Sequence, residues 1–116
     1  MQYLLMIYGP EKLWGEYTEA ERQSIYQGYG ELIEDMKKKG NYIGGHELQP
    51  TTMATTVRVR NGKKTITDGP FAETKEQLGG YFLVEAKDLD EALAIAERIP
   101  SATSGSIEVR PVKINS

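Results

Sequence analysis

The chain has 116 residues, which predicts a single domain over residues 1–116. Cysteine is absent, which excludes disulfides, a thiolate nucleophile and cysteine-ligated zinc or iron–sulfur centres. The net charge is −3 and basic residues are mostly scattered, so we expect no nucleic-acid partner. No apolar run has the length of a signal peptide core or a membrane span, so we expect a cytoplasmic protein with no membrane partner.

The first predicted element is a strand over residues 2–8 with apolar side chains on both faces. A loop containing Trp14 is expected over residues 10–17. Together with Tyr8 and Tyr17, Trp14 either forms the aromatic wall of a ligand pocket or packs this loop onto the sheet.

A capping box over residues 18–21 marks the start of a helix, and the apolar positions that follow repeat with a helical period. Lysines 37–39 and Gly40 are typical of the end of that helix. Residues 41–48 then predict a strand whose paired glycines indicate a bulge or close packing.

Residues 54–60 and 63–68 predict two antiparallel strands, because Asn61-Gly62 between them favours a type I′ hairpin turn. Residues 79–86 form another strand that is apolar on both faces. A second helix starts at the N-cap Asp88, stops before Pro100, and precedes a last strand over residues 106–112.

This order predicts an α+β fold of ferredoxin-like type, βαβ(ββ)βαβ, with two helices on one face of an antiparallel sheet. Two helices cover only one face, yet the strands over residues 2–8 and 79–86 are apolar on both. We therefore expect a homodimer in which the uncovered sheet faces of two copies meet.

The motif Asp68-Gly69-Pro70-Phe71 and the segment AETKEQLGG after it resemble the DGPF branch of the YCII-related protein family. The resemblance covers nearly the whole chain and implies a dimeric α+β barrel. It also implies kinship with small monooxygenases, muconolactone-type isomerases and haem-binding chlorite dismutase-like proteins. Members of the DGPF branch are often encoded beside extracytoplasmic-function sigma factors, which implies a regulatory association. Shorter relatives carry a histidine in the first helix, but residues 25–29 contain none here.

Asp68 is the first candidate catalytic residue. It shares a strand face with Lys64 and Ile66, and if that face is buried, desolvation would suit the carboxylate to act as a general base. In the alternative interpretation, the carboxylate only caps backbone N–H groups of the turn. His46, the single histidine, would assist by proton transfer or has a structural role. No two-histidine spacing exists, so we expect no metal and no haem or other cofactor.

Four further residues are candidate ligand-binding residues. Arg58 would orient an anionic group, or it belongs to a solvated sheet edge. Phe71, Thr74 and Lys75 would lie on a lid hinged at the two glycines 79–80, or Phe71 fills the core.

Two functions follow from these candidates. The first is an acid–base enzyme for a small metabolite, with its site in a cleft between helices and sheet near Asp68. The second is a non-catalytic ligand-binding or regulatory module, and the sequence alone leaves open whether the protein is an enzyme.

Overall fold

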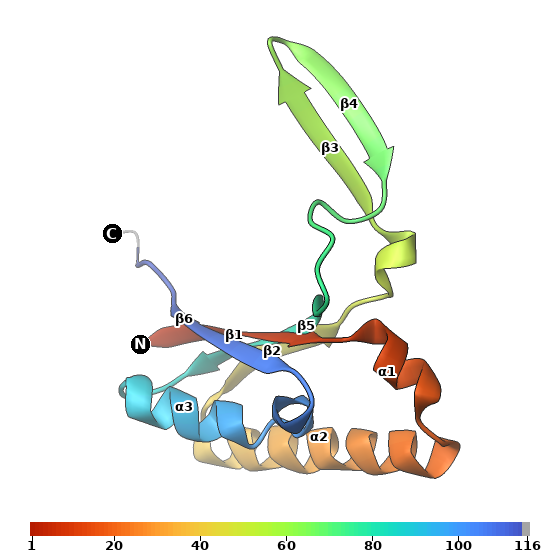
Figure 1. The fold of residues 1–116 in the computed structure, drawn as a ribbon. Helices are drawn as coiled ribbons and strands as arrows, with labels where there is room; N and C mark the ends of the chain where they lie inside the picture. The colour runs from red at the N-terminus through yellow and green to blue at the C-terminus, as the bar shows by residue number, and fades with distance from the viewer. Residues whose placement is uncertain (115–116) are drawn as a thin grey trace.

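Four strands form the main antiparallel sheet of the computed structural model, which describes residues 1–114 (Figure 1). They lie in the order β2, β5, β1, β6. The two central strands are those with apolar residues on both faces. The bounds are β1 Gln2–Gly9, β2 Tyr42–Glu47, β5 Gln77–Glu85 and β6 Ser106–Pro111.

Two helices, α2 (Glu19–Lys39) and α3 (Leu89–Glu97), cover one face of this sheet (Figure 1). The capping box of α2 is confirmed, since the Glu21 N–H donates to Thr18 Oγ1 and the Thr18 N–H donates to Glu21 Oε1. The predicted N-cap of α3 is confirmed as well, because Asp88 accepts the N–H of Glu91 at 2.9 Å. Both helices therefore start where their caps predict.

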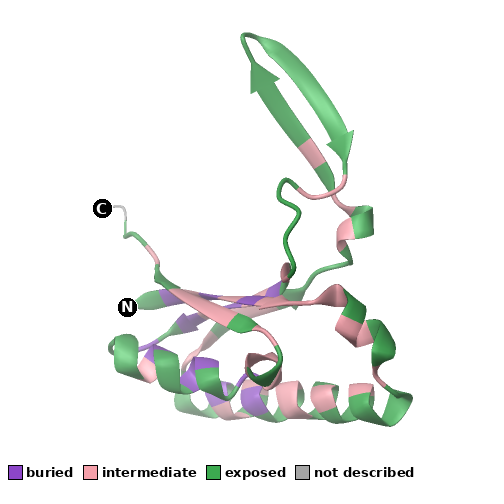
Figure 2. Ribbon diagram, in the orientation of Figure 1, coloured by how far each residue is buried: buried purple, intermediate pink, exposed green. Residues whose placement is uncertain are grey.

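The hydrophobic core lies between the main sheet and these two helices (Figure 2). Alternate side chains of the central strands enter it, as the twofold period of a strand requires. The core residues are Tyr3, Leu5, Ile7, Leu32, Met36, Phe82, Val84, Ala86, Ala92, Ile95, Ala96 and Ile99.

The opposite face of the main sheet, here called the open face, carries no helix of residues 1–114 (Figure 1). The other alternate side chains of β1 and β5 point to it, among them Leu4, Met6, Tyr81 and Leu83, and they are only half-buried within this chain. The expected apolar character of both faces is therefore present, while the homodimer stays a prediction.

A separate two-stranded hairpin, here called the arm, is formed by β3 (Thr55–Arg60) and β4 (Lys63–Asp68). Its type I′ turn is confirmed by positive φ angles at both Asn61 (51°) and Gly62 (75°). The arm rises from the main sheet on the side away from α2 and α3 (Figure 1).

Three short elements depart from the sequence-based prediction. The expected loop over residues 10–17 is wrong in part, because Glu11–Glu16 form the helix α1. A 3₁₀ turn, η2 (Pro100–Thr103), begins at the proline expected only to stop α3. A further 3₁₀ turn, η1 (Thr51–Met53), lies between β2 and β3, where no helical element was expected. All three elements are too short to show a helical period in the sequence. The structure confirms a mixed α+β class with antiparallel sheets. Within residues 1–114, no helix is long and apolar enough to cross a membrane.

Candidate functional site

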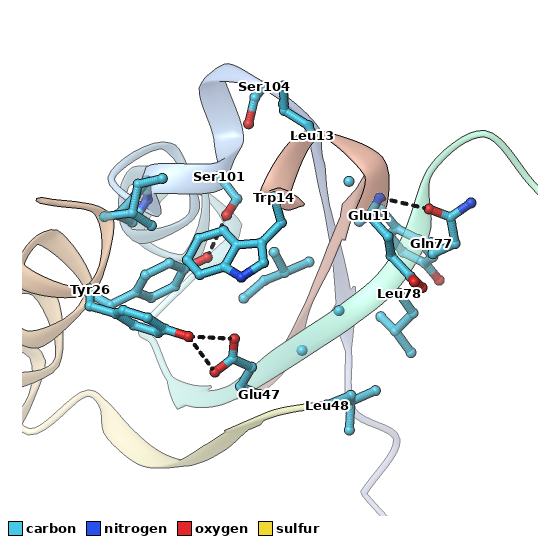
Figure 3. Close-up of a pocket in the computed structure, with 18 of the residues that line it drawn as sticks. Glu11, Leu13, Trp14, Tyr26, Glu47, Leu48, Gln77, Leu78, Ser101 and Ser104 are labelled. Carbon is cyan, nitrogen blue, oxygen red and sulfur yellow. Dashed lines mark hydrogen bonds between the residues drawn. The ribbon is translucent and has the colours of Figure 1, made fainter. Parts of the chain in front are cut away.

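A cavity of about 1030 Å³ lies between the main sheet and the first half of α2 (Figure 3). Strands β1, β2 and β5 form its floor, and α1 and η2 border it. Its volume is at the upper end of the range of about 300–1,000 Å³ for small-molecule sites. Its aromatic lining residues include Trp14, Tyr17, Tyr26, Tyr29, Tyr42 and Phe82.

Trp14 of α1 forms the centre of an aromatic wall of the cavity. Its indole ring packs edge-on against Tyr26, with centroids 5.3 Å apart, and against Tyr17 at 6.0 Å. Arg22 of α2 holds this segment, because its Nε donates to the Trp14 carbonyl at 3.2 Å and its guanidinium lies 5.8 Å from the indole centroid. Of the two interpretations of Trp14, the structure favours the pocket wall.

Glu47 and Tyr26 form a polar pair across the cavity (Figure 3). Glu47 ends β2, and its carboxylate accepts the phenolic O–H of Tyr26 from α2. Partial burial, and secondly the negative charge of Glu47, raises the pKa of Tyr26 above its ordinary value of 10.0. The phenol therefore remains a hydrogen-bond donor at neutral pH.

A second polar pair lies deeper, where the Tyr29 hydroxyl is 2.7 Å from Ser101 Oγ. Burial raises the pKa of Tyr29 above 10.0, although the hydrogen bond with Ser101 opposes this shift. Both hydroxyls line the cavity and link α2 to η2. The cavity thus offers neutral hydroxyl groups as well as a carboxylate.

The α1 end of the cavity is connected to the loops around it by Glu11. The Glu11 N–H donates to Gln77 Oε1 at 3.0 Å, and its carboxylate accepts the Thr51 N–H at 3.0 Å. These two bonds join the start of α1 to the start of β5 and to the segment after β2. They position Trp14, which lies one helical turn further on.

The charge of the cavity has one sign. The described lining residues include Glu11, Glu21 and Glu47; they also include His46, but no Lys or Arg. Carboxylates only accept hydrogen bonds and repel anions, so this cavity favours neutral or cationic molecules that carry O–H or N–H groups.

The predicted residue His46 lies on β2 next to Glu47 and belongs to the lining of the cavity, while its imidazole pairs with Tyr81 on the open face. Its register partner is Tyr81, and the imidazole Nδ1 is 2.9 Å from the Tyr81 hydroxyl. Consecutive strand residues point to opposite faces, which separates the imidazole from the Glu47 carboxylate.

The other predicted residues lie on the arm and in the segment after it, and none of them lines the cavity. Arg58 and Phe71 are brought together, with the guanidinium 5.3 Å from the ring centroid. Phe71 is 73% exposed and does not fill the core. Lys75 is exposed, and the Thr74 hydroxyl donates to the Glu76 carbonyl, a local contact. The roles of these residues stay predictions.

Asp68 ends β4 and is exposed within this chain. The turn after it requires glycine, because Gly69 has a φ of 100°. Within residues 1–114, the Asp68 carboxylate has no hydrogen-bond or ion-pair partner, so the capping alternative is not observed. No contact within the described chain joins Asp68 to His46.

The sequence did not single out Tyr26, Tyr29, Glu47 or Ser101. Tyr26 and Tyr29 follow Arg22 at helical spacing, which indicates one face of α2, but nothing in that pattern separates a cavity from a core. Within residues 1–114 no group of three or more His, Asp or Glu side chains is placed to hold a metal ion.

The YCII-related domain family matches residues 1–114 of the chain. The chain therefore belongs to the YCII-related domain family. It is 34% identical over 116 residues to the uncharacterized protein R00369 of Rhizobium meliloti (strain 1021), a match that covers 98% of this chain and 94% of that protein. Among solved structures, it is similar to 5-chloro-2-hydroxyhydroquinone dehydrochlorinase from Burkholderia phenoliruptrix AC1100, in complex with 2,5-dihydroxybenzoquinone. That match has 16% identity, a TM-score of 0.49, and covers 99% of this chain and 96% of that chain.

Proposed function

We propose that this YCII-related protein binds a small, neutral or cationic molecule with a flat ring in the cavity beneath α2. The observation that carries the proposal is the cavity of about 1030 Å³, lined by aromatic residues and by carboxylates without Lys or Arg. Aromatic walls favour flat rings, and a few polar groups orient the ligand. The Glu47–Tyr26 pair is the orienting group in this proposal.

If the protein is an enzyme, we propose that it carries out acid–base chemistry on the bound ligand, with Glu47 as the base. A ligand O–H or N–H would donate to the Glu47 carboxylate, which would take up the proton. Tyr26 would hold the carboxylate in place and, as a neutral phenol, could donate to the ligand oxygen. Binding without reaction, as in a regulatory module, uses the same contacts and differs only in the absence of turnover.

Asp68 is a second candidate base, under the further proposal that the chain belongs to the DGPF branch of the family. The observation that favours Asp68 is that it lies on the same face of the arm as Val57 and Ile66, whose side chains are exposed in the single chain. Cover by a partner would exclude water from the Asp68 carboxylate, and a partly desolvated carboxylate is suited to accept a proton from a substrate as a general base.

For the assembly, we propose a dimer with the open faces of two copies packed together, the dimeric α+β barrel arrangement. The half-buried residues Leu4, Met6, Tyr81 and Leu83 support it, because contiguous apolar patches are rarely left in water. The sheet order β2-β5-β1-β6 with two helices on one face is compatible with ferredoxin-like halves.

Trp14 provides the test, because it is the single tryptophan and it lines the cavity. Tryptophan fluorescence is titrated with matched ring compounds: phenol and catechol, benzylamine, and the anion benzoate. We expect quenching by the neutral and cationic compounds and little by benzoate. The Glu47→Gln variant should lose this preference, whereas Glu108→Gln, outside the cavity, should retain it. Stronger binding of benzoate, or no response to any ring compound, would contradict the proposal.

A further inference from the structure

Within residues 1–114, the contacts of the arm with the rest of the chain are local, such as those of Thr56 with Gly69 and of Arg58 with Phe71 at its base. In the described residues, β3 and β4 pair only with each other, and no arm residue belongs to the hydrophobic core. The radius of gyration is 16.2 Å, whereas a compact chain of this length has about 13 Å. A lone two-stranded hairpin is marginally stable in water, so the extended arm requires a surface to pack on.

One face of the arm carries three apolar side chains, Val57, Val59 and Ile66, here called the apolar stripe; Lys64, opposite Val59, and the pair Thr55 and Asp68 border the stripe on the same face. Val57 lies opposite Ile66 in the strand register, and Val59 is two residues further along the same face. Their exposed fractions are 60%, 61% and 60%. The opposite face carries Arg58, whose guanidinium lies 5.3 Å from the centroid of the Phe71 ring.

The charge of the arm is opposite to that of the rest of the chain. The arm carries Arg58, Arg60, Lys63 and Lys64, and its only acidic residue is Asp68, at its base. The chain has 14 basic and 17 acidic residues, so the chain outside the arm holds ten basic and 16 acidic residues. The rest of a second copy therefore has a net charge opposite to that of the arm, which favours their approach; of the four basic residues, Lys64 lies on the face of the stripe.

The position of the arm favours the same partner. It rises on the side of the main sheet on which the open face lies (Figure 1). A second copy packed on the open face would lie beside the arm, so that its apolar stripe could be covered without a change in the fold.

We infer that the arms are clasps, each packing its apolar stripe on the other copy of the chain. This inference rests on the proposed dimer and adds that residues 55–68 belong to the interface. Because Asp68 lies on the face of the stripe, the partner copy would then also complete the surroundings of this carboxylate.

Paramagnetic labelling tests the clasp directly, because the chain contains no cysteine. A Val59→Cys chain with a nitroxide label and no isotope is mixed, through unfolding and refolding, with ¹⁵N-labelled wild-type chain. We expect broadened amide signals in the wild-type copy. A label at Glu34→Cys, on the exposed side of α2, is the matched control and should broaden few of them.

A dimer by light scattering without this broadening would overturn the clasp and leave the proposed dimer intact. A monomer at the same concentration would overturn both. Neither result touches the ligand proposal, which the Trp14 titration tests separately.

Two lysine substitutions provide a second measurement that does not depend on a label. Val57→Lys places a charge in the apolar stripe, and Thr65→Lys places the same charge on the other face of the arm. We expect Val57→Lys to weaken dimer association roughly tenfold or more, and Thr65→Lys to change it much less. Equal dissociation constants in analytical ultracentrifugation would contradict the clasp.

Discussion

The phenolic oxygen of Tyr26 lies 3.2 Å from each carboxylate oxygen of Glu47, so that one contact joins α2 to β2 across the candidate site. Glu47→Gln removes the charge that helps raise the pKa of Tyr26. We expect the Tyr26 pKa to fall toward 10.0 in this variant, measured by NMR titration of ¹³Cζ-labelled tyrosine. The control variant Glu108→Gln should leave it unchanged. A Tyr26 titration that is the same in all three proteins would refute this role of Glu47.

The hydrogen bond between Tyr29 and Ser101 predicts a non-additive effect on stability. Ser101→Ala leaves the half-buried phenol without its partner, so we expect a loss of about 1–2 kcal/mol in the free energy of unfolding. Tyr29→Phe removes the phenol hydroxyl itself, and the double variant should then cost little more than Tyr29→Phe alone. Urea denaturation of the four proteins measures the coupling, and strictly additive losses would speak against the bond.

Gly45 is required because the aromatic core residue Phe82 lies over it. A Cβ at Gly45 would come within 2.5 Å of Phe82 Cδ1 and 2.7 Å of the Tyr81 carbonyl oxygen. We expect Gly45→Ala to lower the free energy of unfolding by about 1–3 kcal/mol. Gly44→Ala is the matched control, since its Cβ would meet nothing within 4 Å. Equal shifts of the urea midpoint in the two variants would contradict the requirement for a glycine at Gly45.

Asp35 predicts how stability depends on acid. The hydrogen bond from Arg98, with a second contribution from Lys39, lowers the Asp35 pKa below its ordinary 3.8. A lowered folded-state pKa means that the contribution is present above about pH 3.8 and is lost as the pH falls through the folded-state value. We expect the melting temperature of Asp35→Asn to fall less than that of wild type between pH 5 and pH 2. Parallel pH profiles would exclude this contribution.

Local signals in the sequence predicted most elements, because their causes are local. The capping box at Thr18, the N-cap Asp88 and the type I′ turn at Asn61-Gly62 each involve only neighbouring residues, and all three are confirmed. The helix α1 was missed because six residues without a side-chain cap show no period.

The candidate site was much less predictable. Glu47 meets Tyr26 only because β2 and α2 pack on each other, and no spacing within the chain indicates this contact. Conversely, the prominent motif around Asp68 lies at the base of an arm that extends from the main sheet, and its contacts within residues 1–114 are local, such as the Thr56 hydroxyl donating to the Gly69 carbonyl. A motif indicates that residues occur together in sequence, whereas a cavity depends on contacts between distant elements.

The separation of the arm from the core has an evolutionary consequence. Since residues 55–68 contribute no core side chain, their sequence can diverge while the rest of the chain keeps its folding stability. A cell that holds several paralogues could keep their subunits from mixing through changes in this hairpin alone. Gene duplication would then produce distinct assemblies without any redesign of the ligand cavity.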